Sequence, residues 1–248
     1  MVEEIKQESE RLAKVIARSG LCSRRDAEKL IALGKVKVDG QIITTPATKV
    51  NSNNKIVVDG KAIDAAEKTR LWLFYKPRGY LVSAKDPQGR QTIHDILPKD
   101  LPRIITVGRL DYNSEGLLLL TNNGKLSRHL ELPSTGWKRR YRVRAFGRYN
   151  EDSLDKLRKG CKIDGIQYGK AEITVEKSQG ANNWFEVTIS EGKNREIRKL
   201  FEHINLEVNR LIRVAFGPFQ IGTLTMSQVK EVPSKVIKEQ VGFKAELL

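Results

Sequence analysis

The segment Ile104-Ile105-Thr106-Val107-Gly108-Arg109-Leu110-Asp111-Tyr112-Asn113-Ser114-Glu115-Gly116-Leu117-Leu118-Leu119-Leu120 places a polar loop between two strongly apolar stretches. The apolar stretches predict two strands. A rigid sheet would hold the loop firmly, as a catalytic side chain requires. Asp111 is the candidate, because an ionised Asp in a cleft can act as nucleophile or base, and nearby Arg109 would favour its charged form. On spacing alone an alternative stays open, in which Asp111 and Asn113 only make turn hydrogen bonds.

The sequence on either side of this segment predicts more strands than helices. Leu71–Tyr75 is a continuous apolar run typical of a strand buried on both faces. Further strand patterns and two helical patterns follow, at 141–145, 173–175 and 184–189 for strands, and at 151–159 and from about Gly192 for helices. Because the strands come in consecutive runs, we expect an α+β domain with a large, mainly antiparallel or mixed sheet flanked by helices.

The start of the chain predicts a separate small module. Residues 11–18 form one amphipathic helical pattern, and a second begins at a capping signal at Ser23 and ends near Gly34. Two short strand patterns then run into Asp-Gly turns at 39–40 and 59–60. The helices carry basic residues suited to backbone phosphate, namely Arg11, Lys14, Arg18, Arg24 and Arg25. The alternative is that these are ordinary solvated faces.

Composition narrows the function classes. The chain has 248 residues, with 45 Lys+Arg against 30 Asp+Glu and a net charge of +15, which favours a polyanionic partner and nucleic acid first. Its apolar runs are too short for a membrane helix, and its acidic N-terminus is unlike a secretion signal. Two distant cysteines, Cys22 and Cys161, exclude a disulfide framework and suit a reducing cytoplasm.

Two resemblances to known families cover about residues 8–225. The opening, with Arg-Leu-Ala-Lys-Val-Ile-Ala-Arg-Ser-Gly at 11–20 and Gly-Lys-Val-Lys-Val-Asp-Gly at 34–40, resembles the S4 RNA-binding domain. Gly108–Asp111 followed by Ser114–Asn122 resembles the signature of the RsuA/RluB group of pseudouridine synthases. Three more segments fit that group in order: Tyr75–Gly79, Arg140–Val143 and Gly192–Arg198.

The resemblance implies a chemistry and the roles of particular residues. Pseudouridine synthases break the glycosidic C–N bond of uridine, rotate the uracil and rejoin it through carbon, without a cofactor. In this sequence the match gives the essential carboxylate to Asp111, the active-site tyrosine to Tyr141 and the basic partner of the carboxylate to Arg198. Lys76, in the first motif, and Arg109 are expected to support the site. The reacting base must leave its stack to reach the carboxylate.

The residues by themselves leave simpler interpretations open for each of these roles. Tyr141 could be an ordinary half-buried strand aromatic, and Arg198 could form an i,i+4 ion pair with Glu202. Arg140, Arg142 and Arg144 share one strand face, either to meet RNA or to protect an exposed edge strand by charge. Lys193 and Arg195, at the start of the last predicted helix, are further candidates for RNA contact.

The expected protein is therefore an RNA-modifying enzyme without metal or cofactor, since the three histidines and two cysteines show no zinc-ligand spacing. We expect an S4-like domain at 8–63, a linker at 64–70, a synthase domain at 71–232 and a tail at 233–248. The segment Glu131–Trp137, joined to the arginine strand, most resembles the branch of this group that acts on large-subunit ribosomal RNA. The alternatives are a small-subunit enzyme or a non-catalytic RNA-binding or ribosome-assembly protein. We expect a cytoplasmic monomer that acts on a structured stem-loop of ribosomal RNA or on a pre-ribosomal particle.

Overall fold

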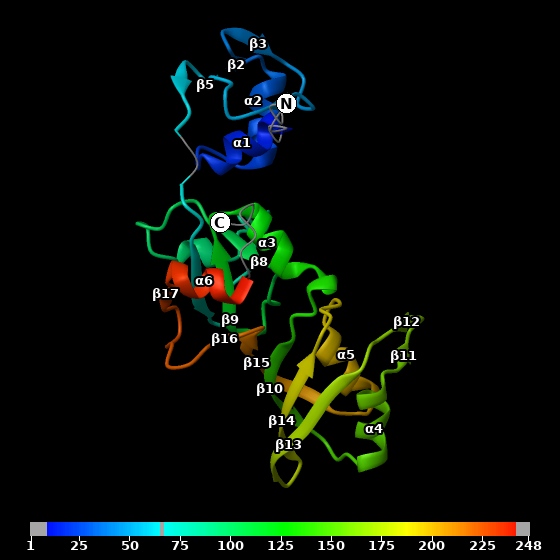
Figure 1. Ribbon diagram of the computed structural model, residues 1–248. Coiled ribbons are helices and arrows are strands. Elements are labelled where there is room, and N and C mark those ends of the chain that lie inside the picture. The colour runs from blue at the N-terminus through cyan, green and yellow to red at the C-terminus, as the bar shows by residue number, and fades with distance from the viewer. Residues whose placement is uncertain (1–8, 65–66, 242–248) are drawn as a thin grey trace, which may run out of the picture. The chain divides into compact units, whose positions relative to one another are not determined.

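The computed structural model describes residues 9–64 and 67–241, which form two units (Figure 1). The smaller unit holds the described residues up to Thr69, together with the short pieces 102–104 and 122–124. All other described residues belong to the larger unit. Residue 8, the first of the expected S4-like domain, and residues 242–248 of the expected tail lie outside the described residues.

The smaller unit confirms the two predicted helices and the hairpins. Helix α1 (Leu12–Arg18) and helix α2 (Arg24–Ala32) bury Leu12, Ile16 and Ile31 in one core. The Ser23 side chain caps α2 by accepting a hydrogen bond from the Asp26 amide at 3.1 Å. The strands of this unit are β1 (Glu10–Arg11), β2 (Val36–Val38), β3 (Gln41–Ile43), β4 (Lys49–Val50), β5 (Ile56–Val58) and β6 (Lys61–Ala62). They pair as β3-β2-β5-β6 and as β1-β4.

In the larger unit, nine strands of the described chain form one mixed sheet in the order β13-β14-β10-β15-β9-β7-β17, with β16 on β15 and β8 on β9. Their bounds are β7 (Leu71–Lys76), β8 (Ile105–Val107), β9 (Glu115–Thr121), β10 (Arg139–Phe146), β13 (Ala171–Gln179), β14 (Asn182–Ile189), β15 (Glu207–Phe216), β16 (Phe219–Gln220) and β17 (Val229–Glu231). Strands β11 (Lys162–Ile163) and β12 (Ile166–Gln167) form a separate hairpin. The predicted α+β class is confirmed.

Strand β9 joins the two halves of this sheet. All seven of its residues are buried, as its run of leucines predicts. One edge of β9 pairs with β7 along its length, whereas the other edge pairs with β8 near Thr121 and with β15 near Gly116. The β9–β15 pairing is parallel, and the strand pairs on either side of it are antiparallel. The polar loop 108–114 therefore enters β9 where the two halves of the sheet meet.

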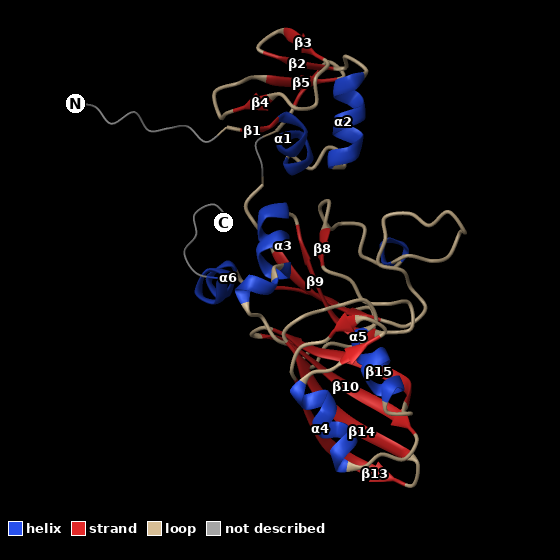
Figure 2. Cartoon of the chain, turned by 90° about the vertical axis from the view of Figure 1, so that its right-hand side faces the viewer, coloured by secondary structure: helices blue, strands red, loops and turns tan. Residues whose placement is uncertain are grey.

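Helices cover both halves of the large sheet (Figure 2). The helices are α3 (Gly124–Glu131), α4 (Glu151–Lys159), α5 (Glu196–His203) and α6 (Ser234–Val241), with 3-10 turns at Ile93–Asp95 and Pro133–Thr135. Helices α3 and α6 share an apolar core with β7 and β9. On the other half, Phe201 of α5 meets the ring of Phe185 on β14 edge-on, with ring centroids 5.1 Å apart.

Three boundaries of domains or helices in the structure differ from those predicted from the sequence. Residues 234–241, placed in a tail, form α6, and its Ile237 and Val241 are buried in the core of the larger unit. Arg70, placed in a linker, forms a bidentate ion pair with Glu231 of β17 at 2.7 and 2.5 Å. The last predicted helix begins at Glu196, because Arg195 has a left-handed φ of 52° and ends a loop that starts at Gly192. Long-range contacts decide the first two boundaries, whereas a local backbone conformation decides the third.

Candidate active site

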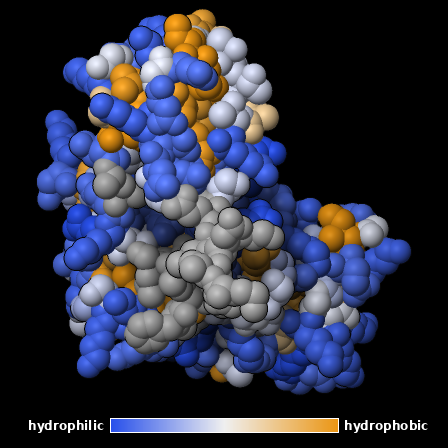
Figure 3. All heavy atoms as spheres, turned by 45° about the horizontal axis from the view of Figure 1, so that its top comes forward, coloured by the Kyte–Doolittle hydropathy of each residue, from blue (hydrophilic) through white to orange (hydrophobic). Residues whose placement is uncertain are grey.

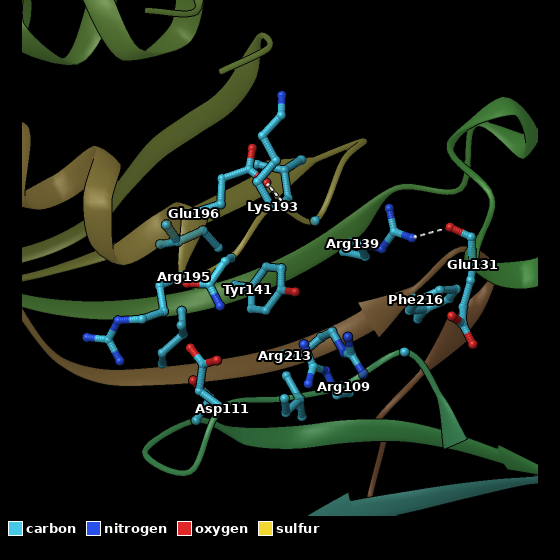
Figure 4. Close-up of a pocket in the computed structure, with 18 of the residues that line it drawn as sticks. Arg109, Asp111, Glu131, Arg139, Tyr141, Lys193, Arg195, Glu196, Arg213 and Phe216 are labelled. Atoms are coloured by element: carbon cyan, nitrogen blue, oxygen red, sulfur yellow. Dashed lines mark hydrogen bonds between the residues drawn. The ribbon is translucent and has the colours of Figure 1, made fainter. Parts of the chain in front are cut away.

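A pocket of about 530 Å³ lies where the polar loop, β10, β15 and the start of α5 converge (Figure 4). Asp111 and Tyr141 both line it, although thirty residues separate them in the sequence. The lining residues are Thr106, Gly108, Arg109, Leu110, Asp111, Ser114, Glu131, Pro133, Arg139, Tyr141, Ile189, Gly192, Lys193, Asn194, Arg195, Glu196, Ile197, Leu211, Arg213 and Phe216. Four predicted site residues thus meet Asp111 in one cavity: Arg109, Tyr141, Lys193 and Arg195.

The loop presents the Asp111 carboxylate to this cavity. The turn is closed by main-chain atoms, with the Ser114 amide donating to the Asp111 carbonyl at 3.0 Å. The side chain of Asp111 points into the pocket beside Tyr141 and Arg195 (Figure 4). Because the main chain makes the turn, the carboxylate is left for a ligand. The alternative of a purely turn-forming aspartate does not describe this arrangement.

Lys76 holds the loop from beneath. Its ammonium group is fully buried and donates to the carbonyls of Pro77 at 3.0 Å, Asp111 at 3.1 Å and Ser114 at 2.9 Å. Burial lowers the pKa of Lys76 to about 8, and the Asp111 and Glu115 carboxylates partly oppose this effect. Its three protons have three acceptors, so the lysine fixes the backbone at Asp111 and at Ser114, the two ends of the turn.

Arg198 contacts the same loop through its main chain. Its guanidinium donates to the carbonyl of Asn113 at 2.9 Å and to the carbonyl of Val208 at 2.9 Å. Burial lowers the pKa of Arg198, Arg195 lowers it further, and the Asp111 carboxylate raises it. The contact between Arg198 and the loop is thus a hydrogen bond to the Asn113 carbonyl, and among the described residues no hydrogen bond or ion pair joins Arg198 to the Asp111 carboxylate. Within the described residues, Arg198 makes no ion pair with Glu202.

A second cluster holds the start of β9 behind the loop. The Glu115 carboxylate is buried and pairs with Arg210 of β15 at 2.7 Å. The Tyr75 hydroxyl of β7 donates to the same carboxylate at 3.3 Å. Burial raises the pKa of Tyr75, and the Glu115 charge raises it further. Side chains from β7, β9 and β15 therefore contact one another at Glu115, where the loop ends and β9 begins.

The structure places three predicted RNA-binding arginines away from the pocket. Tyr141 is 8% exposed and lies on the buried face of β10, while Arg140, Arg142 and Arg144 lie on the opposite face. Arg142 pairs with Glu176 at 2.8 Å and stacks over Trp184 at 4.9 Å. Arg140 lies 3.8 Å from the Glu186 carboxylate. The alternative of an exposed edge strand protected by charge is wrong, because β10 lies between β14 and β15 in the sheet. Contact of these arginines with RNA stays a prediction.

The basic residues of the smaller unit are partly engaged with acidic neighbours. Lys14 and Arg18 both pair with Glu10, at 2.8 and 2.7 Å, and Arg24 pairs with Glu28 at 3.2 Å. Arg11 and Arg25 are exposed. Hydrophilic side chains dominate the face of the molecule in Figure 3, in keeping with the net charge of +15.

The pocket residues that the sequence analysis did not propose include three with charged side chains, namely Arg139, Glu196 and Arg213, besides Glu131. Arg139 is two residues before Tyr141 and shares its face, so the alternation that separated the other arginines could have found it. Arg213 interrupts the apolar run Leu211-Ile212-Arg213-Val214-Ala215-Phe216, and a single arginine in such a run signals a buried charge. Burial raises the pKa of Glu196 to about 7, and the nearby Glu191 carboxylate contributes to the increase.

The described residues contain no group of three or more His, Cys, Asp or Glu side chains arranged to hold a metal ion. Over the same residues, no helix combines the length and apolar character needed to cross a membrane. The pocket offers the carboxylates of Asp111, Glu131 and Glu196, the phenol of Tyr141, the ammonium group of Lys193 and several guanidinium groups.

Comparisons with known proteins identify the family of this chain. Residues 70–203 match the family model of RNA pseudouridylate synthase, and residues 10–56 match that of the S4 domain. An uncharacterized RNA pseudouridine synthase of Rickettsia felis is 50% identical over 93% of this chain and 100% of its own length. The ribosomal large subunit pseudouridine synthase B of Haemophilus influenzae is 43% identical over 87% of this chain and 62% of its own length. A crystal structure of a pseudouridylate synthase shares the fold, with a TM-score of 0.67 and 23% identity over 94% of this chain and 99% of that one.

Proposed function

The chain belongs to the RNA pseudouridine synthases that carry an S4 domain, and on this premise we propose that it isomerises a specific uridine of large-subunit ribosomal RNA. The observation that carries the proposal is that Asp111 and Tyr141 line the same pocket. Lys76 fixes the loop that holds Asp111. Relatives that are 42–43% identical over more than four fifths of this chain are named for the large subunit, which favours that RNA over the small-subunit one.

In the proposed reaction Asp111 is the group that meets the nucleoside. Its carboxylate either attacks the nucleoside or removes a proton from the sugar, and either route breaks the glycosidic C–N bond. The detached uracil rotates, a ring carbon bonds to the sugar, and the proton on that carbon leaves. The product is an isomer of the substrate, so the reaction needs no net oxidation or reduction.

Tyr141, which lines the pocket, and Lys76 and Arg198, which bind the loop, position the reactants. Tyr141 packs on the flipped uracil and assists the late proton transfer. Arg198 and Lys76 hold the backbone at Asn113 and at Asp111, so the carboxylate meets each substrate in the same orientation. One chain supplies both Asp111 and Tyr141, so one copy is sufficient for the proposed reaction. We infer a cytoplasmic location from the ribosomal substrate.

Selection of the uridine is assigned to contacts outside the pocket. One flipped uridine resembles any other, so RNA shape and flanking nucleotides must distinguish the site. The basic residues of the S4 domain, together with Lys193 and Arg195 at the pocket, provide contacts to a folded stem-loop. The substrate is therefore a structured segment of ribosomal RNA, either free or within an assembling particle.

The proposal is tested by mapping pseudouridine in ribosomal RNA from a strain that lacks this gene. We expect loss of one pseudouridine, or very few, in the large-subunit RNA, with restoration by the intact gene. The purified protein should modify the same uridine in a folded large-subunit fragment and leave a scrambled strand and the small-subunit RNA unmodified. Equal modification of both ribosomal RNAs would contradict the choice of substrate, and no change in either RNA would contradict the activity on ribosomal RNA.

A further inference from the structure

Two buried arginines meet at the end of the pocket away from Asp111. Arg139 is 8% exposed and Arg213 is 3% exposed, so both guanidinium groups are shielded from bulk water. Both contact the ring of Phe216, with their Cζ atoms 4.9 and 5.3 Å from its centroid. Figure 4 shows Arg109 beside Arg213, with Arg139 on the neighbouring strand β10. Three cationic side chains thus surround one part of the cavity.

The hydrogen bonds of Arg213 are incomplete. Its Nε donates to the Leu117 carbonyl at 2.7 Å. Its Nη2 is buried and has no hydrogen-bond partner among the described residues. A buried donor without an acceptor is costly, and such donors in native proteins call for a specific explanation. Since Arg213 lines the pocket, a ligand in the pocket is the natural acceptor.

The Arg139 guanidinium also makes its hydrogen bonds to main-chain carbonyls and not to a carboxylate. Its Nη1 donates to the Ser190 carbonyl at 2.9 Å, and its Nη2 to the Glu131 carbonyl at 3.4 Å. These neutral oxygens satisfy donors but do not neutralise the cation. Burial lowers the pKa of Arg139 and the charge of Arg213 lowers it further, whereas the Glu196 and Glu131 carboxylates partly oppose this effect.

The two nearest carboxylates to Arg139 have other partners. The Glu131 carboxylate accepts a hydrogen bond from Ser127 at 2.7 Å, and Figure 4 shows it turned away from Arg139. The Glu196 carboxylate accepts a hydrogen bond from the Lys193 amide at 2.8 Å. The arrangement therefore keeps an excess of positive charge at this end of the pocket.

We propose that Arg139 and Arg213, with exposed Arg109 at the rim, form a phosphate-binding subsite that takes one backbone phosphate next to the flipped uridine. Guanidinium groups match the geometry of phosphate oxygens, and a phosphate supplies both the acceptor for Arg213 and the charge that the cluster lacks. A neutral uracil ring would supply only the acceptor. This inference rests on the proposed function, because it takes the nucleotide at Asp111 to belong to an RNA strand.

The first test uses inorganic phosphate with the full-length protein. The melting temperature is measured in phosphate and in chloride at equal ionic strength for wild type, Arg139→Gln, Arg109→Gln and Lys156→Gln. Lys156 is exposed on α4 and serves as the charge-matched control. We expect phosphate to stabilise wild type and Lys156→Gln more than it stabilises either arginine variant. The general effect of phosphate on protein stability is common to all four proteins and cancels.

The second test uses a substrate RNA in which the phosphates around the modified uridine are replaced, one at a time, by uncharged methylphosphonates. One replacement should slow single-turnover pseudouridine formation by wild type about tenfold, the value expected for a lost charge-assisted hydrogen bond. Arg139→Gln should be slowed by a similar factor on the unmodified RNA and little further on the replaced RNA. Lys156→Gln should behave as wild type on both.

The two tests have outcomes that distinguish failure of the phosphate-binding subsite from failure of the proposed function. Phosphate stabilisation without any methylphosphonate effect would assign the cluster to free phosphate and overturn the RNA contact. Equal phosphate stabilisation of wild type, Arg139→Gln and Arg109→Gln would overturn the subsite. Arg109 is exposed, so its variant remains informative if Arg139→Gln fails to fold. If wild type forms no pseudouridine on the unmodified RNA, the proposed function fails, and the inorganic phosphate test still decides whether the anion site exists.

Discussion

The buried ammonium group of Lys76 lies 3.1 Å from the main-chain carbonyl oxygen of Asp111, the residue that presents its carboxylate to the pocket. Lys76 ends β7, which pairs with β9 so that Lys76 lies opposite Gly116. The sheet register therefore sets the position of the carboxylate through a single lysine. The same lysine binds the Ser114 carbonyl at 2.9 Å, so it holds both ends of the turn.

Replacement of Asp111 by Asn should abolish pseudouridine formation. The amide keeps the shape of the side chain but loses the charge that the reaction uses. We expect activity at background and RNA affinity within a few-fold of wild type, measured by tritium release or mapping together with filter binding. Appreciable turnover by Asp111→Asn would move the chemistry to another residue.

Catalysis should slow as the pH rises through about 8, because neutral Lys76 can no longer donate to all three carbonyls. The pKa of Lys76 is lower in the folded chain than its ordinary 10.5, so its titration makes the folded chain more stable as pH rises from about 8 to 10.5. A loss of rate with no loss of stability therefore distinguishes loop loosening from unfolding. Lys76→Met should be slow at every pH, and an unchanged alkaline limb in that variant would contradict the assignment.

Glu196 should make stability depend on pH in the opposite direction. Its pKa is raised from 4.5 to about 7, chiefly by burial, so its contribution is fully present below about 4.5 and is lost as pH rises through 7. We expect the free energy of unfolding of Glu196→Gln, measured with urea, to fall less over this range than that of wild type. Glu202→Gln, exposed on the same helix, is the control and should follow wild type.

Gly116→Ala should destabilise the larger unit severely. A Cβ atom at this position would lie 2.3 Å from the carbonyl oxygen of Arg213, and the backbone has a φ of +104° that disfavours alanine. We expect a loss of at least about 3 kcal/mol in the free energy of unfolding, since the clash falls on backbone atoms that cannot move aside. Gly165→Ala has a similar positive φ of +79° but open space, and should cost only about 1 kcal/mol. Similar losses in both variants would contradict the close approach of β9 and β15.

Substitution of Arg11 and Arg25 by Gln should weaken RNA binding in a salt-dependent way. Both side chains are exposed in the smaller unit. Each lost phosphate contact should reduce the slope of log affinity against log salt by about 0.7–0.9. Thermal unfolding should be unchanged, which separates lost contacts from lost structure. An unaltered slope would mean that Arg11 and Arg25 do not contact phosphate and belong to a solvated basic face.

Most strands and helices could be predicted from local pattern, because alternation and helical spacing record which face of an element is buried. Leu117–Leu120 and the alternation at Tyr141, Val143 and Ala145 both lie in strands with the expected buried faces. Helix α6 was missed, since a single turn-spaced pair, Ile237 and Val241, is a weak signal until the core it enters is known. The late start of α5 depends on the left-handed backbone of Arg195, which its side chain does not encode.

By itself, the sequence determined the two-part organisation, the α+β class, and the candidates Asp111 and Tyr141, through motifs that lie within continuous segments. Only the tertiary structure decided that Lys76 fastens the loop, that Arg198 binds the Asn113 carbonyl, and that Arg139 and Arg213 share one end of the pocket. These partners lie on strands, a loop and helix α5 that are far apart in the sequence, and they meet only after β7 and β15 pair with β9. Local pattern reports which face of a strand is buried, whereas strand order and register decide which buried groups become neighbours.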